Sequence, residues 1–421
     1  MAFFRELFRF LEAGSRAYAK WDLEVSSSIL RKRKKLLILL ILCLPIIAVC
    51  IAEAYEAQGM LGGHSAYAPA YYTTSIFLAA IALGFAAGLI TGCIGAGGGF
   101  IITPALMAMG VKGILAVGTD LFHIFAKAIM GTSIHSKLGN VSVRLAIAFL
   151  AGSIGGTFIG GALNKSLYDA NPILSDLFIS SIYAVLLGLL GFYALYDFMG
   201  TRRAANAGKE SAKDENGKPG RLAAALQCVP LPPMIKFDEK FKLGGASISA
   251  WIVAAGGIVV GFLAAIMGVG GGFVTFPMFV YIFGVSSMTT VGTDIFQIIF
   301  TAGFAAIGQY AIYGYVFYAL AIGMLLGSLV GIQIGALTTT VVSESHIRGF
   351  YAVAILSGFF NRVATLPKKL VELEVLSWPA SVVNLIEQAG NVVFWAVVAF
   401  FALWVSSKFF LNLSRLRGEI A

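Results

Sequence analysis

The sequence predicts an all-α polytopic membrane protein made of two related halves. Of its 421 residues, 58% are hydrophobic and only 12% are charged, whereas about 25% of the residues of a soluble domain are charged. A surface that faces lipid needs no charge, so this deficit indicates a membrane protein. Long apolar runs and a glycine-rich pattern that occurs twice are the other two observations behind the prediction.

The charge distribution predicts which segments face the cytoplasm. The net charge is +9, and the basic residues gather in two tracts beside apolar runs, at 31–35 and between Arg202 and Lys242. Such tracts usually lie on the cytoplasmic side of a membrane, so we interpret them as orientation signals and expect no nucleic-acid partner. The four cysteines are scattered, with no CxxC pair and no histidine at ligand spacing, so we expect no disulfide framework, metal site or other cofactor.

The N-terminal part contains an amphipathic segment and a first span. In residues 1–35, apolar and charged side chains alternate at helical spacing, which predicts a cytoplasmic helix on the lipid headgroups. A solvated helix packed on the protein's own loops would give the same pattern. Residues 36–75 then contain an apolar run at 36–55, predicted to span the membrane, and a nearly uncharged outside loop.

The first membrane repeat is predicted over 76–198. Apolar runs of about the length of a spanning helix lie at 115–136, 145–163 and 174–198. The stretch 76–110 is too long for one span and too short for two, and glycines interrupt it near the middle. Counting spans from the basic tracts places both of its ends outside, so we expect a re-entrant hairpin.

The second membrane repeat is predicted over 248–365, after a polar cytoplasmic linker at 199–247 that we expect to carry no chemistry. Its hairpin, 248–284, enters from the cytoplasmic side and precedes three further spans. The remainder, 366–421, contains an outside segment, a last span and a cytoplasmic tail. Two lysines in 366–391 disfavour its placement outside. A helix lying in the membrane interface would account for their presence on that side. The apolar runs of this half lie at 289–311, 316–340, 347–365 and 392–411.

The two repeats match residue by residue. The pattern Gly88…Gly95-Ala-Gly97-Gly98-Gly99-Phe100…Pro104 returns as Gly261…Gly268-Val-Gly270-Gly271-Gly272-Phe273…Pro277, at a constant offset of 173. With single-residue insertions, the match continues through Gly-Thr-Asp at 118–120 and 292–294 and through Gly-x-x-x-Gly-x-x-x-Gly from 152 and from 327. A hairpin plus three spans is an odd number of crossings, so the second copy must enter from the opposite side. This predicts an inverted-topology repeat, which many secondary transporters share.

The paired glycine runs suggest an anion site. A chain break inside hydrocarbon needs polar surroundings, and the glycines allow the positive φ angles of such a break. Exposed N–H groups at the start of a half-helix bind anions without any Lys or Arg. The alternative is that the glycines only permit close helix crossing, and we favour that alternative for the Gly-x-x-x-Gly spacings. The candidate glycines are Gly97, Gly98, Gly99, Gly270, Gly271 and Gly272.

Ionisable residues within apolar runs are further candidates. Asp120, His123 and Lys127 are three and four residues apart and therefore share one helix face, which we expect to line the transport path. Because histidine titrates near neutral pH, this face also suggests a proton-linked role. In the second repeat Asp294 is followed by Gln297 and Thr301, so the two halves differ chemically.

Thr119-Asp120 and Thr293-Asp294 have two interpretations. Both pairs follow a glycine, and Thr and Asp are good N-cap residues, so they could simply start helices. They could also contact substrate, and both roles could coexist.

The doubled G-x-G-G-G-x-x-x-x-P hairpin, followed by G-T-x, resembles the TauE/SafE family of sulfite exporters. The similarity covers about 76–198 and 248–365. It implies that the glycine runs and the adjoining Thr119 and Thr293 contact substrate. It also implies that sulfite, an organosulfonate or a related sulfur oxyanion crosses the cytoplasmic membrane. The chain departs from the family pattern in its N-terminal extension, linker and last span, and in Asp120 and Asp294, where the family often has a small polar residue.

We therefore expect a multi-pass transporter in the cytoplasmic (inner) membrane with both termini inside, exporting a small sulfur-containing anion with coupling to protons or to the membrane potential. An importer of sulfate, thiosulfate or another small anion, and an anion channel, are the alternatives. No nucleophile constellation or nucleotide-binding motif predicts an enzyme. A scaffold would not need ionisable side chains at membrane depth. The expected partners are the anion and the bilayer, and a homo-oligomer stays open.

Overall fold

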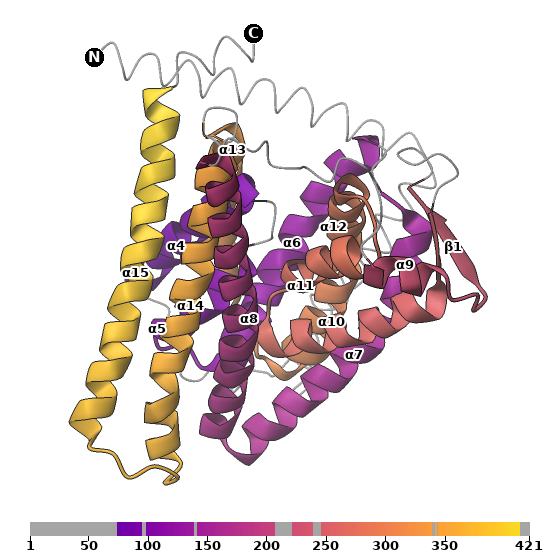
Figure 1. Cartoon of the computed structure of the whole chain (residues 1–421). Coiled ribbons are helices and arrows are strands. Elements are labelled where there is room, and N and C mark those ends of the chain that lie inside the picture. The colour runs from indigo at the N-terminus through magenta and orange to yellow at the C-terminus, as the bar shows by residue number, and fades with distance from the viewer. Residues whose placement is uncertain are drawn as a thin grey trace. The chain divides into compact units, whose positions relative to one another are not determined.

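The computed structural model describes residues 74–94, 98–138, 141–206, 221–238, 246–338, 342 and 344–412. The predicted amphipathic segment 1–35, the first span at 36–55, Gly97 and the tail beyond residue 412 lie outside these residues. The described part is helical except for one two-stranded antiparallel sheet, in which Met234 pairs with Ser249 (Figure 1).

The helices follow the order of the two repeats. The first repeat contains α4 (Thr74–Ile94), α5 (Gly99–Ala108), α6 (Gly113–Leu138), α7 (Val143–Ala170) and α8 (Pro172–Asn206). The linker contributes α9 (Arg221–Gln227), β1 (Met234–Phe237) and β2 (Ala246–Ser249). The second repeat contains α10 (Ala250–Met267), α11 (Gly272–Pro277), the π-helix η1 (Met278–Ile282), α12 (Ser287–Phe304), the π-helix η2 (Ala305–Tyr310), the 3₁₀ turn η3 (Ala311–Tyr313), α13 (Tyr318–Thr338) and α14 (Glu344–Glu372), which α15 (Ala380–Leu411) follows.

Within the described residues, seven helical segments are long and apolar enough to cross a membrane: Val143–Ala170, Pro172–Gly200, Ala250–Met267, Thr289–Tyr313, Tyr318–Gly335, Gly349–Glu372 and Ala380–Leu411. Six of them coincide with predicted spans, which confirms the prediction of an all-α polytopic membrane protein. The seventh, α10, belongs to the predicted second hairpin. Its 18 residues would measure about 27 Å at 1.5 Å per residue.

After its break the second hairpin folds back along α10. A Cβ placed on Gly256, near the start of α10, would lie 2.6 Å from the Phe283 ring, and one on Gly271 would lie 3.0 Å from Val260. The chain from α11 to η1 therefore runs antiparallel to α10. The linker holds the far end, because Gln227 Nε2 donates to the Phe283 carbonyl and the Asp238 carboxylate accepts from the N–H and the hydroxyl of Ser286, each at 2.7 Å.

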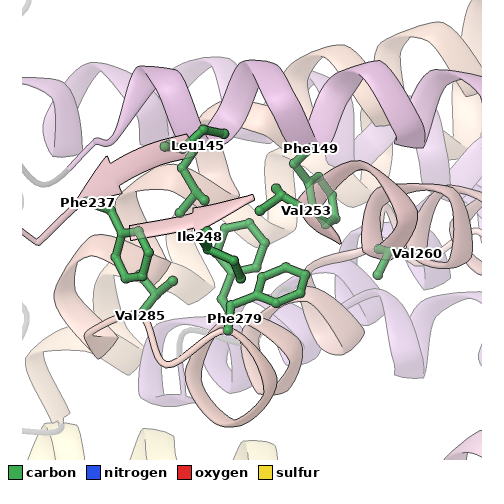
Figure 2. Packing of buried hydrophobic residues seen from close by; sticks show 10 residues of the cluster. Leu145, Phe149, Phe237, Ile248, Val253, Val260, Phe279 and Val285 are labelled. Carbon is green, nitrogen blue, oxygen red and sulfur yellow. The ribbon is translucent and has the colours of Figure 1, made fainter. Parts of the chain in front are cut away.

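The linker sheet packs on this hairpin. Phe237 of β1 and Ile248 of β2 lie in one buried apolar cluster with residues of α7, α10, η1 and the turn that follows η1 (Figure 2). Full burial of such side chains stabilises a fold by roughly 1.5–3 kcal/mol each. This part of the linker is thus integrated into the helical body through its apolar side chains. The labelled members of the cluster are Leu145, Phe149, Phe237, Ile248, Val253, Val260, Phe279 and Val285.

The repeats exchange partners through glycine crossings, with α4 packed on α13 and α7 packed on α10. Cβ atoms on Gly152, Gly156 and Gly160 would lie 1.8, 2.1 and 2.6 Å from the carbonyl oxygens of Ala254, Ile258 and Phe262. Those on Gly327, Gly331 and Gly335 would lie 2.0, 2.3 and 2.4 Å from the carbonyl oxygens of Ile81, Phe85 and Leu89. The two sets of carbonyls are again 173 residues apart. The packing interpretation of these Gly-x-x-x-Gly spacings is confirmed.

The two lysines of the predicted outside segment are neutralised. α14 continues past residue 365 to Glu372 and lies beside α15 (Figure 1). Lys368 Nζ is 2.7 Å from Glu387 Oε2, and Lys369 Nζ is 3.5 Å from Asp176 Oδ2. The pairing with carboxylates provides partners for these two positive charges at the end of α14.

Candidate functional site

The half-helices that follow the two glycine breaks meet through their first aromatic residues. Phe100 of α5 and Phe273 of α11 are equivalent residues of the two repeats, and their rings stack with centroids 5.3 Å apart. A Cβ on Gly99 would lie 3.1 Å from Val269 Cα, so the second break also touches the start of α5. The structure thus brings the two breaks into contact.

Several of the candidate glycines have backbone conformations that a side chain would strain. The φ angles of Gly98, Gly270 and Gly271 are +24°, +66° and +96°. Gly98 and Gly271 occupy the positions immediately before α5 and α11. The sharp change of direction from break to half-helix therefore depends on residues without a Cβ.

A carboxylate lies beside the start of each half-helix. Asp120 Oδ2 is 3.4 Å from the position that a Cβ of Gly99 would occupy, and Asp294 Oδ2 is 3.1 Å from the corresponding position at Gly272. The N–H groups of Gly272 and Phe273 donate to no acceptor among the described residues. Negative charge is favourable at such a helix start, so each aspartate occupies the surroundings that an anion would use.

Thr119 and Thr293 lie inside α6 and α12, and both hydroxyls bind a connecting loop of the other repeat. Thr119 Oγ1 accepts a hydrogen bond of 2.9 Å from the Phe317 N–H, and Thr293 Oγ1 accepts one of 3.0 Å from the Ser142 N–H. α6 begins at Gly113, and the N-cap of α12 is Ser286. The N-cap interpretation of the two Thr-Asp pairs was wrong, because it relied on residue type without knowing where the helices begin.

In the second repeat four polar side chains form a continuous chain of hydrogen bonds that leaves none of them without a partner. Gln297 Nε2 donates to Asp294 Oδ1 at 2.9 Å, and Gln297 Oε1 accepts from Thr301 Oγ1 at 2.7 Å. Thr301 Oγ1 lies 2.9 Å from Ser153 Oγ of α7. All four side chains are buried, and each is satisfied by another member of the chain.

In the first repeat the equivalent cluster is left incomplete. Thr103 Oγ1 donates to Asp120 Oδ2 at 2.9 Å, and His123 Nε2 lies 3.0 Å from Ser328 Oγ. Within the described part of the chain, Asp120 Oδ1, His123 Nδ1 and Lys127 Nζ are buried without a hydrogen-bond partner, and the first two are 3.6 Å apart. A buried polar group left unpaired costs about 1–3 kcal/mol. The three atoms therefore leave hydrogen-bonding capacity in this cluster that the described residues do not use.

The structure adds residues that the sequence analysis did not single out. Thr103, the hydroxyl partner of Asp120, lies in the half-helix α5. Ser153 and Ser328 are equivalent residues of the repeated Gly-Ser pair, so the repeat itself carried the signal for them. Arg362 is 1% exposed near the middle of α14, and a cation inside the apolar run 347–365 is itself a signal that sequence reasoning could have used.

Among the described residues, no group of three or more His, Cys, Asp or Glu side chains could hold a metal ion. The polar atoms of the first-repeat cluster include a carboxylate, an imidazole and an ammonium group. Such a set can exchange protons and stabilise an anion.

Comparison with known proteins identifies the family. The profile of the family described as "Sulfite exporter TauE/SafE" matches residues 80–361. The chain is 25% identical over 274 residues to "Probable membrane transporter protein YunE" of Bacillus subtilis (strain 168), covering 62% of this chain and 87% of that protein. It is 27% identical over 259 residues to "Probable membrane transporter protein YjnA" of the same organism, covering 61% and 87%. No solved structure matches the chain. The resemblance seen in the sequence is confirmed: this chain belongs to the TauE/SafE sulfite exporter family and is a multi-pass membrane transporter.

Proposed function

We propose that this transporter exports a small sulfur-containing anion, such as sulfite or an organosulfonate, across the cytoplasmic membrane, and that both termini are cytoplasmic. The family description supports the substrate class and the direction. The observation that carries the proposal is the set of three buried, unpaired atoms, Asp120 Oδ1, His123 Nδ1 and Lys127 Nζ, on the helix face beside the start of α5.

The site would bind an anion at the start of α5, with Lys127 supplying the positive charge. Without substrate, the Asp120 carboxylate occupies the favourable end of the helix dipole. A second negative charge placed there would be repelled, unless Asp120 takes up a proton. Anion binding and protonation of Asp120 are then coupled, and His123, between Asp120 and Lys127 along the helix, would pass the proton on.

An inverted-topology repeat would give this site access to both sides in turn. The reciprocal glycine crossings and the stacked Phe100 and Phe273 support a twofold relation between the repeats. In transporters with inverted repeats, one repeat or bundle rocks against the other around a central site. In this scheme the second repeat, in which Asp294 is fully hydrogen-bonded, acts as the rigid support. The first repeat, in which the Asp120 cluster has unpaired atoms, binds the substrate and the proton.

The test is flux in proteoliposomes that contain the purified chain. Labelled sulfite, sulfoacetate, thiosulfate and sulfate are offered from either side, with and without a proton gradient. We expect flux of at least one sulfur anion to depend on the proton gradient and to fall at least tenfold in K127M, whereas K165M, which removes a lysine paired with Asp169 on α7, keeps wild-type flux. Absence of flux for every anion under all conditions would refute a carrier for this class. Accumulation only in the import direction, or currents far above carrier turnover, would instead favour an importer or a channel.

A further inference from the structure

Arg362 is a buried cation outside the cluster of Asp120, His123 and Lys127. It lies in α14 at 1% exposure. Removing a guanidinium from water is costly unless an anion or many hydrogen bonds replace its hydration. Inside a membrane protein, such a residue usually faces a partner or a transport path.

The partners of Arg362 are all neutral. Its Nε and Nη2 atoms donate to Asn361 Oδ1, at 2.9 and 2.5 Å. Nη2 also donates to the carbonyl oxygen of Pro104 at 3.2 Å, and Nη1 lies 3.3 Å from the sulfur of Met107. These bonds orient the guanidinium group against α5, and none of them is made to a carboxylate.

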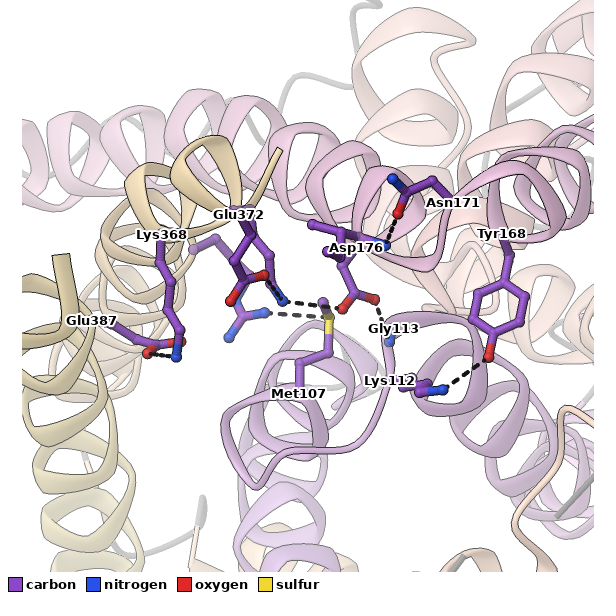
Figure 3. A network of polar contacts seen from close by, with 12 residues as sticks. Met107, Lys112, Gly113, Tyr168, Asn171, Asp176, Lys368, Glu372 and Glu387 are labelled. Atoms are coloured by element: carbon purple, nitrogen blue, oxygen red, sulfur yellow. Dashed lines mark hydrogen bonds and ion pairs between the residues drawn. The ribbon is translucent and has the colours of Figure 1, made fainter. Parts of the chain in front are cut away.

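The nearby carboxylates are committed elsewhere. Asp176 accepts from the Gly113 N–H at 2.8 Å and lies 3.5 Å from Lys369, and Glu387 binds Lys368 at 2.7 Å (Figure 3). No carboxylate of the described residues lies within 4 Å of Arg362. Arg362 therefore has no carboxylate in direct contact, and Asp176 and Glu387, each already paired with a lysine, act on its charge only from a distance.

α5 connects Arg362 to the candidate site. Thr103 donates to Asp120, and the carbonyl of the next residue, Pro104, accepts from Arg362. From Gly99 to Pro104 the helix rises about 7–8 Å at 1.5 Å per residue. Arg362 thus lies roughly one and a half turns from the start of α5, on the way toward the turn at Gly110.

We propose that Arg362 is a second anion-binding residue of the transport path, which holds the substrate before it reaches, or after it leaves, the start of α5. Its guanidinium group has the planar donor geometry that suits sulfonate or sulfite oxygens. A guanidinium charge that no carboxylate contacts favours an anion over a neutral molecule of the same shape. This inference rests on the proposed function.

The test uses labelled methanesulfonate and its neutral analogue methanesulfonamide in proteoliposomes. R362Q removes the charge, and N361D leaves Arg362 in place but puts a carboxylate where Asn361 Oδ1 already binds it. Asn361 Nδ2 donates to Asn391 Oδ1, and Asn391 can rotate its amide to donate to the new carboxylate. We expect both variants to raise KM for methanesulfonate at least tenfold and to lose the preference over methanesulfonamide, with R362K largely restored. K369Q serves as the control and stays within twofold of wild type. Lys369 lies seven residues after Arg362 in α14, and its charge is paired with Asp176.

The outcomes separate this inference from the proposed function. If wild-type protein transports methanesulfonate and folded N361D retains its KM and charge preference, Arg362 is only a structural tie and the inference is wrong. N361D keeps the packing and adds an ion pair, so it remains informative even if R362Q does not fold. If the wild-type protein carries no sulfur anion at all, the proposed function fails first.

Discussion

Phe100 and Phe273 are equivalent residues of the two repeats, and they stack on each other at 5.3 Å where the two half-helices begin. Each follows a glycine that lies against an aspartate, Asp120 in one half and Asp294 in the other. The two aspartates belong to equivalent clusters of the two repeats. All side chains of the Asp294 cluster are hydrogen-bonded, whereas the Asp120 cluster contains unpaired atoms.

Replacing Asp120 by Asn should uncouple transport from pH. Asn resembles the protonated acid, so the anion would no longer compete with a carboxylate at the start of α5. In the wild type, flux should rise as the pH on the entry side falls, because protonation of Asp120 favours anion binding. D120N should show nearly constant flux between about pH 5 and pH 8, the range in which histidine and perturbed carboxylates titrate. Methanesulfonate is the suitable substrate, since it stays ionised across this range.

D294N is the comparison for that experiment. Asp294 is held by Gln297, so we expect its replacement to leave the pH response of the flux in place, whatever its effect on the rate. A pH response that survives in D120N and disappears in D294N would assign the proton to the second half.

Gly271 should be required for transport beyond its effect on folding. Its φ of +96° makes an alanine there strained, at a cost of roughly 1–2 kcal/mol. Gly110 has a similar φ of +91° but has no neighbour within 4 Å, so G110A is a matched control for strain. We expect both variants to lose thermal stability, G271A the more because its Cβ would also lie 3.0 Å from Val260, and we expect a loss of flux only in G271A. Equal flux in the two variants would mean that the break is structural alone.

Gly156 and Gly331 should respond to substitution in the same way, because they occupy equivalent crossings. A Cβ would lie 2.1 Å from the Ile258 carbonyl oxygen in one case and 2.3 Å from that of Phe85 in the other. Overpacking of this kind costs about 1–3 kcal/mol. Thermal unfolding in detergent should therefore show lower midpoints for both G156A and G331A. G155A, whose Cβ would meet nothing within 4 Å, should keep the wild-type midpoint.

The inverted repeat predicts that the open ends of the two hairpins face opposite sides. Cys228 is exposed and adjoins the end of the second hairpin through the bond from Gln227 to Phe283. Lys112 is exposed at the end of the first. In a background without the other cysteines, an impermeant thiol reagent should label Cys228 from the cytoplasmic side and K112C from the outside. Labelling of both from one side would refute the inverted arrangement.

The sequence by itself determined that this is a helical membrane protein with two related halves. Low charge, apolar runs and a constant repeat offset depend only on residue type and order, and each follows from the demands of a bilayer on any chain. The family resemblance rested on the same repeated glycines. The first residues of the helices were harder to predict from the sequence. The N-cap interpretation of Thr119 and Thr293 was wrong because both helices begin further upstream in the structure.

Only the tertiary structure decided which polar atoms are satisfied. Asp120 and Asp294 have the same place in the repeated motif, yet one belongs to a cluster with unpaired atoms and the other to a closed chain that Ser153 completes from α7. The bonds from Arg362 to Pro104 and Met107 cross more than 250 residues of sequence. Hydrogen bonding and charge compensation depend on distances between helices that are remote along the chain, and no local pattern encodes those distances.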